Sequence, residues 1–195
     1  MALFLTTRLD FLKIWHYLIQ QGRKEYSAGV RLVAMGCASL VFGFGIPAFL
    51  FWLSAVGADR WRFKSSPVLS VICLVVATLG LLLAAWTGWV QFRYARGTPI
   101  PIMPTKKLLT DKPYSFCRNP MGLGAILFYS GIAVYTASFL AMLAVLLFTF
   151  LLMAYIKLIE EKEMLLRFGD EYARYQQSTP FIIPRLSRGK REPKA

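Results

Sequence analysis

Residues 121–156 read MGLGAILFYSGIAVYTASFLAMLAVLLFTFLLMAYI and contain no charged side chain over 36 positions. A single helix of that length would extend about 54 Å, whereas the hydrocarbon core of a bilayer is about 30 Å thick. We therefore predict a tight helical hairpin with arms at residues 120–136 and 139–159. The turn is expected at residues 135–138, YTAS, the most polar part of the run.

The segments on either side of this hairpin have a different character. The preceding segment, residues 93–120, contains five prolines and six Lys or Arg residues, which exclude a membrane span or a long helix. Its apolar residues favour an ordered, functional loop. After the hairpin, IEEKEMLLRFG keeps helix-forming residues up to Gly169, a residue type that suits the position after a helix end. A short amphipathic piece with Tyr172 and Tyr175 on one side is expected next.

Two further charge-free segments lie upstream, at residues 32–56 and 67–92. Each is longer than the roughly 20 residues that cross a bilayer, so each is predicted to span the membrane. Pro47 is expected to kink the first of them. The second segment has small residues at every fourth position, namely Gly80, Ala84 and Gly88. This spacing predicts close approach of a neighbouring helix.

The fold class predicted is an all-α integral membrane protein with about four transmembrane helices. An N-terminal amphipathic helix at residues 8–21 either lies in the membrane interface or packs on the rest of the protein. The chain is divided into residues 1–96, with this helix and two spans, residues 97–186, with the loop, the hairpin and a C-terminal cytoplasmic helix, and a basic tail at 187–195.

Charge is strongly unbalanced, with 23 Lys and Arg against 10 Asp and Glu. A net charge of +13 is compatible with nucleic-acid binding, but it also fits a membrane protein with basic cytoplasmic loops. The long apolar runs and the 56% hydrophobic content favour the membrane protein, so no nucleic-acid partner is expected. Lys and Arg number 5, 3, 6 and 9 in the successive non-spanning segments. This distribution predicts that both termini and the 93–120 loop are cytoplasmic.

Cysteine and histidine are too few for several kinds of site. Three cysteines without a CxxC pair, and one histidine, do not support a disulfide framework, a zinc site or a Ser-His-Asp triad. No metal is therefore expected. Cys117 adjoins Arg118, whose charge could lower the pKa of the thiol, but no partner base is visible.

The hairpin is expected to bring two distant segments to one membrane boundary. Its arms extend about 26 and 31 Å, so Glu160 and Glu161 return close to Arg118 and Asn119. A helix N-terminus with an adjacent Arg favours an anionic group, and a pair of carboxylates favours a cation or a hydroxyl. Together these residues could hold a small zwitterion.

Simpler interpretations of the same residues remain open. The glutamates could form a solvated first turn above the membrane, with Glu163 and Arg167 paired at i,i+4. Asn119 before Pro120 could serve only as a helix N-cap. Arg118 could be an interfacial side chain that extends to water.

The order KKLLTDKPYSFCRNPMGLG (106–124), an apolar hairpin, then EEKEMLLRFGDEYARYQQSTPFIIP (160–184) resembles a family of integral membrane enzymes. This is the isoprenylcysteine carboxyl methyltransferase and phospholipid methyltransferase superfamily. The resemblance covers about residues 97–184. It implies a helical fold with a C-terminal catalytic half, S-adenosyl-L-methionine as methyl donor, and an acceptor that is a membrane lipid or a prenylated or hydrophobic small molecule.

The resemblance also implies roles for individual residues. Those that would bind the methyl donor are Lys106, Lys107, Leu108, Leu109, Tyr114, Asn119, Pro120, Met121, Gly122 and Glu160. We assign catalytic roles to Arg118, Asn119 and Glu161, and substrate binding to Lys157.

The sequence departs from the family pattern at several positions. The histidine of the family's arginine-histidine-proline word is Asn119 here, and an amide cannot act as a base near neutral pH. The tyrosine usual two positions after that proline is Gly122. The histidine that opens the donor segment in eukaryotic members is Lys106. The arginine expected about four residues before the glutamates is Ile156, with Lys157 as a possible substitute.

Two other functions remain open from the sequence. NADPH-dependent sterol-type reductases have a similar C-terminal half, although no further feature of this chain favours a dinucleotide. Alternatively, the protein is a non-catalytic membrane scaffold, which the missing histidine and Gly122 would explain. The oligomeric state is not predicted.

Overall fold

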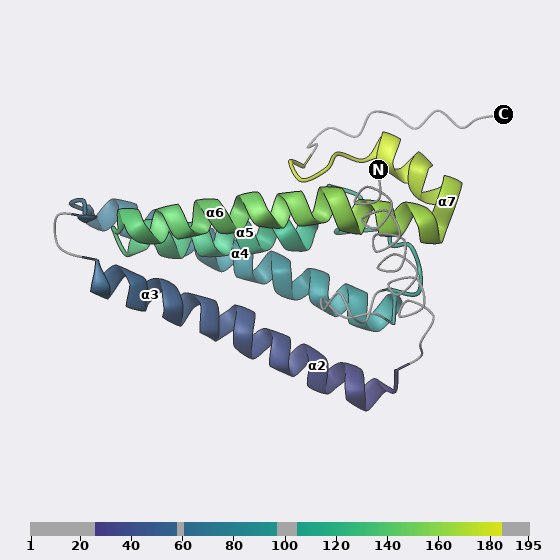
Figure 1. Ribbon diagram of the computed structural model, residues 1–195, viewed down its shortest axis with the longest axis horizontal. Coiled ribbons are helices and arrows are strands. Elements are labelled where there is room, and N and C mark those ends of the chain that lie inside the picture. The colour runs from purple at the N-terminus through teal and green to yellow at the C-terminus, as the bar shows by residue number, and fades with distance from the viewer. Residues whose placement is uncertain (1–25, 58–60, 97–104, 185–195) are drawn as a thin grey trace, which may run out of the picture.

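The computed structural model describes residues 26–57, 61–96 and 105–184. All regular secondary structure in these residues is helical (Figure 1). The elements are α2 (Ala28–Leu40), the π-helical turn η1 (Val41–Gly45), α3 (Ile46–Val56), α4 (Pro67–Tyr94), α5 (Pro120–Tyr135), α6 (Phe139–Tyr155), the π-helical turn η3 (Ile156–Glu160) and α7 (Glu161–Ser178). The N-terminal helix expected at 8–21 and the tail at 187–195 lie outside the described residues.

Three continuous helical stretches are long and apolar enough to cross a membrane, namely Ala28–Val56, Pro67–Tyr94 and Phe139–Ser178. Helix α5 is apolar but shorter, with 16 residues. The chain is therefore a multi-pass membrane protein, as predicted. In the third stretch about 20 residues are enough to cross the hydrocarbon core. Counted from Phe139, the crossing ends before Glu160, which lies beyond the apolar part with the whole of α7.

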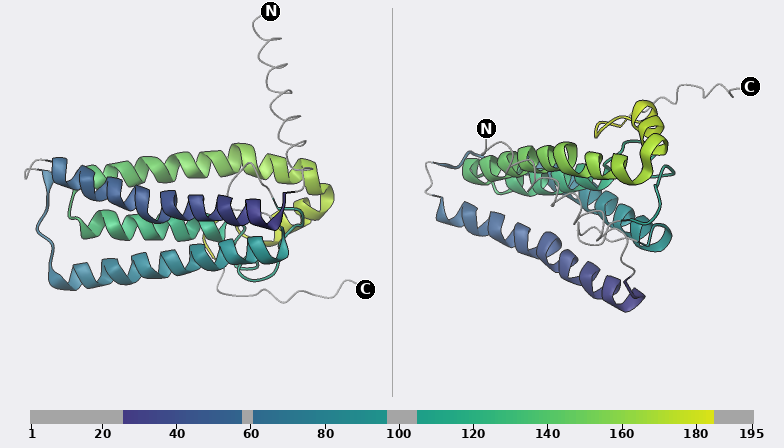
Figure 2. Two further views of the ribbon diagram at one scale, coloured as in Figure 1. Left: turned by 90° about the horizontal axis from the view of Figure 1, so that it is seen from below. Right: turned by 45° about the vertical axis from the view of Figure 1, so that its right-hand side comes forward.

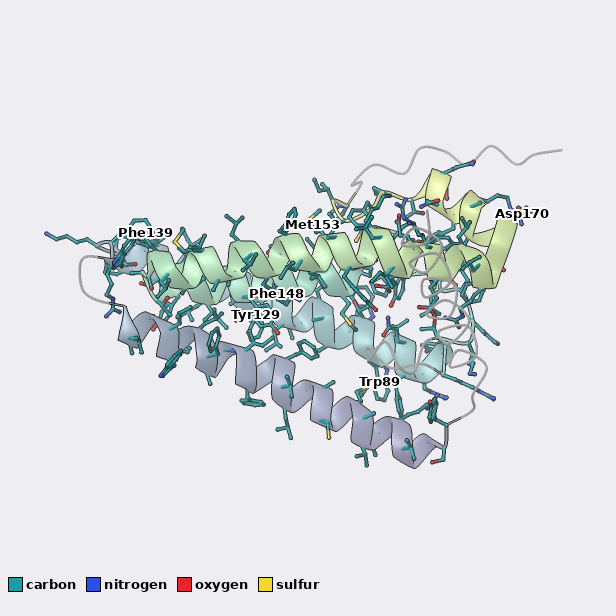
Figure 3. All side chains as sticks on the ribbon, viewed as in Figure 1. Trp89, Tyr129, Phe139, Phe148, Met153 and Asp170 are labelled. Atoms are coloured by element: carbon teal, nitrogen blue, oxygen red, sulfur yellow. The ribbon has the colours of Figure 1, made fainter. Side chains whose placement is uncertain are left out.

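The predicted hairpin is confirmed. Helix α5 ends at Tyr135 and α6 begins at Phe139, so the connection falls where the polar residues indicated it. The hydroxyl of Ser138 accepts a hydrogen bond from the backbone N–H of Ala141 at 3.3 Å and caps α6. Figure 3 shows Phe139 at this end of the molecule and Asp170 at the opposite end, where α7 lies.

Helix α5 lies between α4 and α6 (Figure 1), and glycines allow it to approach α4 closely. A Cβ atom on Gly80 would lie 2.5 Å from the backbone nitrogen of Phe128, and one on Gly124 would lie 2.7 Å from that of Ala84. No side chain fits at such distances, so the two backbones are in direct contact. This confirms the close approach predicted from Gly80 and Ala84.

Helices α2 and α3 form one rod that packs on the others mainly through α3, which contacts α5 and α6. Towards its N-terminal end α2 diverges from the bundle (Figures 1 and 2), and Ala38 is the buried residue of α2. The turn η1 lies immediately before α3, whose second residue is Pro47. The disturbance expected at Pro47 thus takes the form of a wider helical turn, which accommodates the missing N–H and the bulk of the ring.

Tyr129 of α5 packs at the centre of the bundle. Its ring packs edge-on against Phe148 with the ring centroids 5.1 Å apart (Figure 3), and its hydroxyl donates to the carbonyl of Phe42 at 2.7 Å. This hydrogen bond ties η1 to the hairpin.

Helix α7 is broken at Gly169, where φ is 53° and ψ is −129°. Residues other than glycine rarely adopt this conformation. The helix predicted to end at Gly169 does end its straight course there, and a second helical piece then folds back over the end of the bundle (Figure 1). Its tyrosines, Tyr172 and Tyr175, are both buried, as the expected amphipathic pattern requires.

Candidate functional site

A polar cluster lies at the end of the bundle opposite the hairpin turn. It forms where the loop before α5 meets the start of α7, and its centre is the ion pair between Arg118 and Glu161. The Arg118 Nη2 and Glu161 Oε1 atoms are 2.6 Å apart, and the two side chains are only 8% and 5% exposed. The hairpin therefore brings the two segments together as predicted.

Both carboxylate oxygens of Glu161 are fully engaged. Oε1 accepts hydrogen bonds from Nε and Nη2 of Arg118 at 3.0 and 2.6 Å. Oε2 accepts from Nζ of Lys157 at 2.7 Å and from Nε2 of Gln176 at 3.0 Å. Burial alone would raise the pKa of Glu161, but the hydrogen bonds from Lys157 and Arg118 lower it below its ordinary value. The interpretation of Glu161 as part of a solvated turn is wrong, because its side chain is buried and paired.

Arg118 also holds the chain that follows α7. Its Nη1 donates to the carbonyls of Gln176 and Thr179 at 2.7 and 2.6 Å, and its backbone N–H donates to the carbonyl of Pro180 at 2.8 Å. The interpretation of Arg118 as an interfacial side chain extending to water is therefore wrong. A guanidinium can bond three partners at once through its planar fork, which explains why Arg serves here.

Asn119 stands at the N-cap position of α5 but does not cap the helix. Its Nδ2 instead donates to the carbonyl of Phe181 at 2.9 Å. The cap prediction is wrong because the backbone of Asn119, at φ −126° and ψ 59°, is not in the extended conformation of most N-caps. Pro120 does occupy the first helical position, as expected.

The thiol of Cys117 is 1% exposed, and burial raises its pKa. The expectation that Arg118 lowers this pKa is wrong. The guanidinium is committed to Glu161, and the cost of placing a thiolate in a buried position dominates.

Glu160 contrasts with its neighbour. Its half-buried carboxylate makes no hydrogen bond or ion pair with any residue that the structure describes. Burial, together with the negative charges of Glu163 and Glu161, raises the pKa of Glu160 from 4.5 to about 7. A carboxylate in this situation is destabilised by its surroundings, and a bound cation would relieve it.

Glu163 completes the glutamate cluster, which we define as Glu160, Glu161 and Glu163. Glu163 pairs with Arg167 at 3.2 Å, which confirms the i,i+4 pair expected in one of the interpretations. Arg167 also donates to the backbone carbonyl of Thr105 and so fixes the loop to α7. Two of the three glutamates are thus paired with cations of the protein, whereas Glu160 pairs with none in the part of the chain that the structure describes.

Tyrosines line the space between the loop and α7. The Tyr175 hydroxyl donates to the Tyr114 carbonyl at 2.7 Å, and the Tyr114 hydroxyl accepts from Nε2 of Gln91 at 2.7 Å. Tyr114, Tyr172 and Tyr175 form a buried cluster against which Leu108 and Leu109 pack. Burial raises the pKa of all three tyrosines, and the charge of Glu160 contributes for Tyr114 and Tyr172. Gln176, next to Tyr175, donates to Glu161, so the glutamates and this tyrosine cluster adjoin.

The structure explains two of the departures from the family pattern as one feature. A Cβ on Gly122 would lie 3.2 Å from Cδ1 of Ile156, and Ile156 is 3% exposed. The small residue at 122 and the branched apolar residue at 156 therefore fit one another across the hairpin. Lys157, the substitute considered for the missing arginine, is 56% exposed and pairs with Glu161.

The remaining predicted site residues lie in the same region. The backbone N–H of Lys106 donates to the carbonyl of Ala95 at 2.7 Å and joins the loop to the end of α4, whereas Lys107 is exposed. Met121 is half-buried in the first turn of α5. The roles assigned to these residues stay predictions.

Sequence reasoning missed Gln91 and Gln176. Gln91 lies in the last turns of α4, before the segment identified as functional, and Gln176 lies beyond the glutamates. A signal was available for Gln91, because an amide in a nearly uninterrupted apolar segment requires a partner. In residues 26–57, 61–96 and 105–184, no group of three or more His, Cys, Asp or Glu residues is gathered so that it could hold a metal ion.

The chain is similar to known proteins over the region that builds this site. A family model described as phospholipid methyltransferase matches residues 68–171, from the start of α4 into the second part of α7. The cobalt-zinc-cadmium resistance protein CzcN of Cupriavidus metallidurans is 31% identical over 153 residues, or 78% of this chain. The chain spans 64% of that relative's length. No solved structure matches. The family match covers more than half of the chain, and the protein therefore belongs to the phospholipid methyltransferase family, within a superfamily of integral membrane methyltransferases.

Proposed function

We propose that the protein is an S-adenosyl-L-methionine-dependent methyltransferase that acts at the membrane interface on a lipidic or hydrophobic acceptor. The observation that carries the proposal is the uncompensated carboxylate of Glu160 beside buried tyrosines. Membership of the phospholipid methyltransferase family supports it.

The residues present fit the proposed methyl donor. S-adenosylmethionine carries two positive charges, on its sulfonium and its ammonium group, and one negative charge on its carboxylate. In the glutamate cluster Arg118 and Lys157 both pair with Glu161, and Arg167 pairs with Glu163, so none of these three cations pairs with Glu160. A positively charged group of the ligand beside Glu160 would favour the ionised form of Glu160.

Methyl transfer requires little of the protein beyond the positioning of the methyl donor and the acceptor. The bound donor supplies an electrophilic methyl group on a sulfonium. Direct displacement then requires that donor and acceptor be held in line and shielded from water. Arg118 and Glu161 suit this purpose as positioning residues, because together they fix the loop before α5 against the chain after α7. A catalytic contact of Arg118, Asn119 or Glu161 with the reacting groups stays a prediction.

The surroundings of the site support an acceptor that comes from the bilayer. Ile156 and Leu152 lie beside Gly122 on the membrane side of Glu160, so this side of the site is apolar. We propose a membrane lipid or a prenylated or other hydrophobic small molecule as acceptor. Lys157, exposed at the same boundary, remains the candidate for contact with its polar group.

We further propose that α5 completes a fourth crossing together with the hairpin turn. Both termini and the 93–120 loop would then be cytoplasmic, as the Lys and Arg distribution predicts. In this orientation the polar donor reaches the site from the cytoplasm and the acceptor from the bilayer.

The charges around Glu160 argue against a dinucleotide phosphate bound next to that residue. NADPH carries several phosphate charges and requires unpaired cations. Arg118, Lys157 and Arg167 are each paired with a glutamate, and Glu160 would repel an anion.

The proposal is tested by methyl transfer in membranes from cells that produce the protein, supplied with S-adenosylmethionine labelled in the methyl group. We expect label in the lipid or hydrophobic extract above that of control membranes. Glu160→Gln should abolish the excess, whereas Glu171→Gln, at an exposed position on α7, should leave it unchanged. Label at the control level with the folded wild-type protein would contradict the proposed activity.

A further inference from the structure

Gln91 places an amide oxygen without a partner in the interior of the site. Its Nε2 donates to the Tyr114 hydroxyl at 2.7 Å, but its Oε1 is buried and has no hydrogen-bond partner among the described residues. A buried acceptor left unpaired in this way carries a desolvation cost, and such groups call for a specific explanation.

Two acceptors of the same region lack a hydrogen-bond partner among the described residues. Gln91 Oε1 and the Glu160 carboxylate both lack a donor from the described part of the chain, and the Tyr114 hydroxyl already accepts from Gln91. Tyr175 donates to the Tyr114 carbonyl, and the next residue, Gln176, donates to Glu161 beside Glu160, so these groups belong to one neighbourhood. A ligand that fits here brings N–H or O–H donors and positive charge.

We infer that Gln91 binds the methyl donor. Its amide oxygen accepts a hydrogen bond from an N–H or O–H group of the bound S-adenosyl ligand. The inference rests on the proposed function and adds to it a residue from α4. The region expected to bind the methyl donor, residues 97–186, is then incomplete without the end of α4.

A different role for Gln91 makes a distinct prediction. If Gln91 only holds Tyr114 in place, then Gln91→Met should have no effect once the Tyr114 hydroxyl has been removed. If Gln91 contacts the ligand directly, the substitution should weaken binding even in a Tyr114→Phe protein. A double-mutant cycle therefore separates direct contact from positioning.

The probe is S-adenosylhomocysteine, the demethylated product, titrated by calorimetry into full-length protein in detergent. It keeps the adenosine and amino-acid groups of the donor and undergoes no turnover. We expect Gln91→Met to weaken binding about tenfold in both the wild-type and the Tyr114→Phe background, the effect of one buried hydrogen bond. Gln177→Met, an exposed glutamine on α7, is the matched control and should bind like wild type.

Two outcomes would overturn the inference. One is unchanged affinity of Gln91→Met in the Tyr114→Phe background, with wild-type protein that does bind. The other is absence of binding by folded wild-type protein, which would remove the proposed function as well. Thermal unfolding shows whether each variant is folded. If Gln91→Met does not fold, Gln91→Asn replaces it, because the shorter side chain withdraws the amide oxygen by one methylene. We expect the same loss of affinity for Gln91→Asn.

Discussion

Glu160 and Glu161 are adjacent in the chain but lie in opposite electrostatic environments. Glu161 accepts four hydrogen bonds, and its pKa is lowered. Glu160 accepts none from the described residues, and its pKa is raised to about 7. The sequence placed both glutamates near Arg118. Which of the two forms the ion pair depends on how the helix is rotated through η3, and no local sequence pattern predicts that rotation.

The raised pKa of Glu160 predicts a pH-dependent stability. Between pH 4.5 and 7 the folded protein holds a proton at Glu160 that the unfolded chain releases, so this residue's contribution to stability is lost as pH rises through that window. Glu160→Gln removes the effect. At pH 8 we expect the variant to unfold at a Tm roughly 5 °C above wild type, and at pH 5 at nearly the same Tm.

Thermal unfolding in detergent at the two pH values is the measurement, with Glu171→Gln as the exposed control. A Glu160→Gln variant that unfolds below wild type at pH 8 would show that the carboxylate has a stabilising partner.

Arg118 predicts a second effect at this scale. Arg118→Met leaves the Glu161 charge buried with fewer partners and should cost about 3 kcal/mol, or roughly 10 °C in Tm. The double variant Arg118→Met, Glu161→Met removes both charges and should lose less than the sum of the two single losses. Strictly additive losses would mean that the ion pair contributes no coupling energy.

At the scale of the element, the helices were predictable, as were the disturbance at Pro47 and the break at Gly169, whereas other local features were not. Charge-free runs and the polar YTAS turn predicted α4 and the hairpin because a bilayer sets the length of a span. The π-helical turns and the hydrogen bond of Asn119 to Phe181 depend on contacts between distant segments. The apolar surroundings of Gln91 in the sequence indicate that its amide needs a partner, but they do not identify Tyr114, which lies 23 residues away.

The contact between α4 and α5 predicts how each glycine responds to substitution. Gly124→Ala would place a Cβ 2.7 Å from the backbone of Ala84, and backbone atoms cannot move aside cheaply. We expect a loss of about 1–3 kcal/mol, seen as a lower Tm in detergent. Gly36→Ala, on α2 with nothing within 4 Å, is the matched control and should be neutral or slightly stabilising. Equal Tm values for both variants would contradict the close contact.

At the scale of the whole molecule, the site is assembled at one end from three parts of the chain. These parts are the end of α4, the loop before α5, and α7 with the residues that follow it. Gly169 turns the second piece of α7 back so that Tyr172, Tyr175 and Gln176 reach the loop. The sequence predicted the loop and the glutamates as neighbours, but the closure by the second helical piece follows from the three-dimensional path of the chain.

The proposed orientation makes a prediction for the intact membrane. In a Cys37→Ala background, Ser65→Cys and Lys107→Cys each place a thiol at an exposed position on opposite ends of the bundle. A membrane-impermeant maleimide should label Ser65→Cys in intact cells and Lys107→Cys only after the membrane is opened. The reverse pattern would invert the orientation that the Lys and Arg distribution predicts.

Binding of a cationic methyl donor by the cluster around Glu160 can be measured by calorimetric titration of purified, folded protein with S-adenosylmethionine. We expect saturable binding that weakens at least tenfold in Glu160→Gln and persists in Glu171→Gln. We also expect weaker binding of wild type as pH falls below about 7, because protonated Glu160 no longer attracts the ligand's positive charge. Absence of saturable binding, or binding that does not change in Glu160→Gln, would show that Glu160 does not form a methyl-donor site.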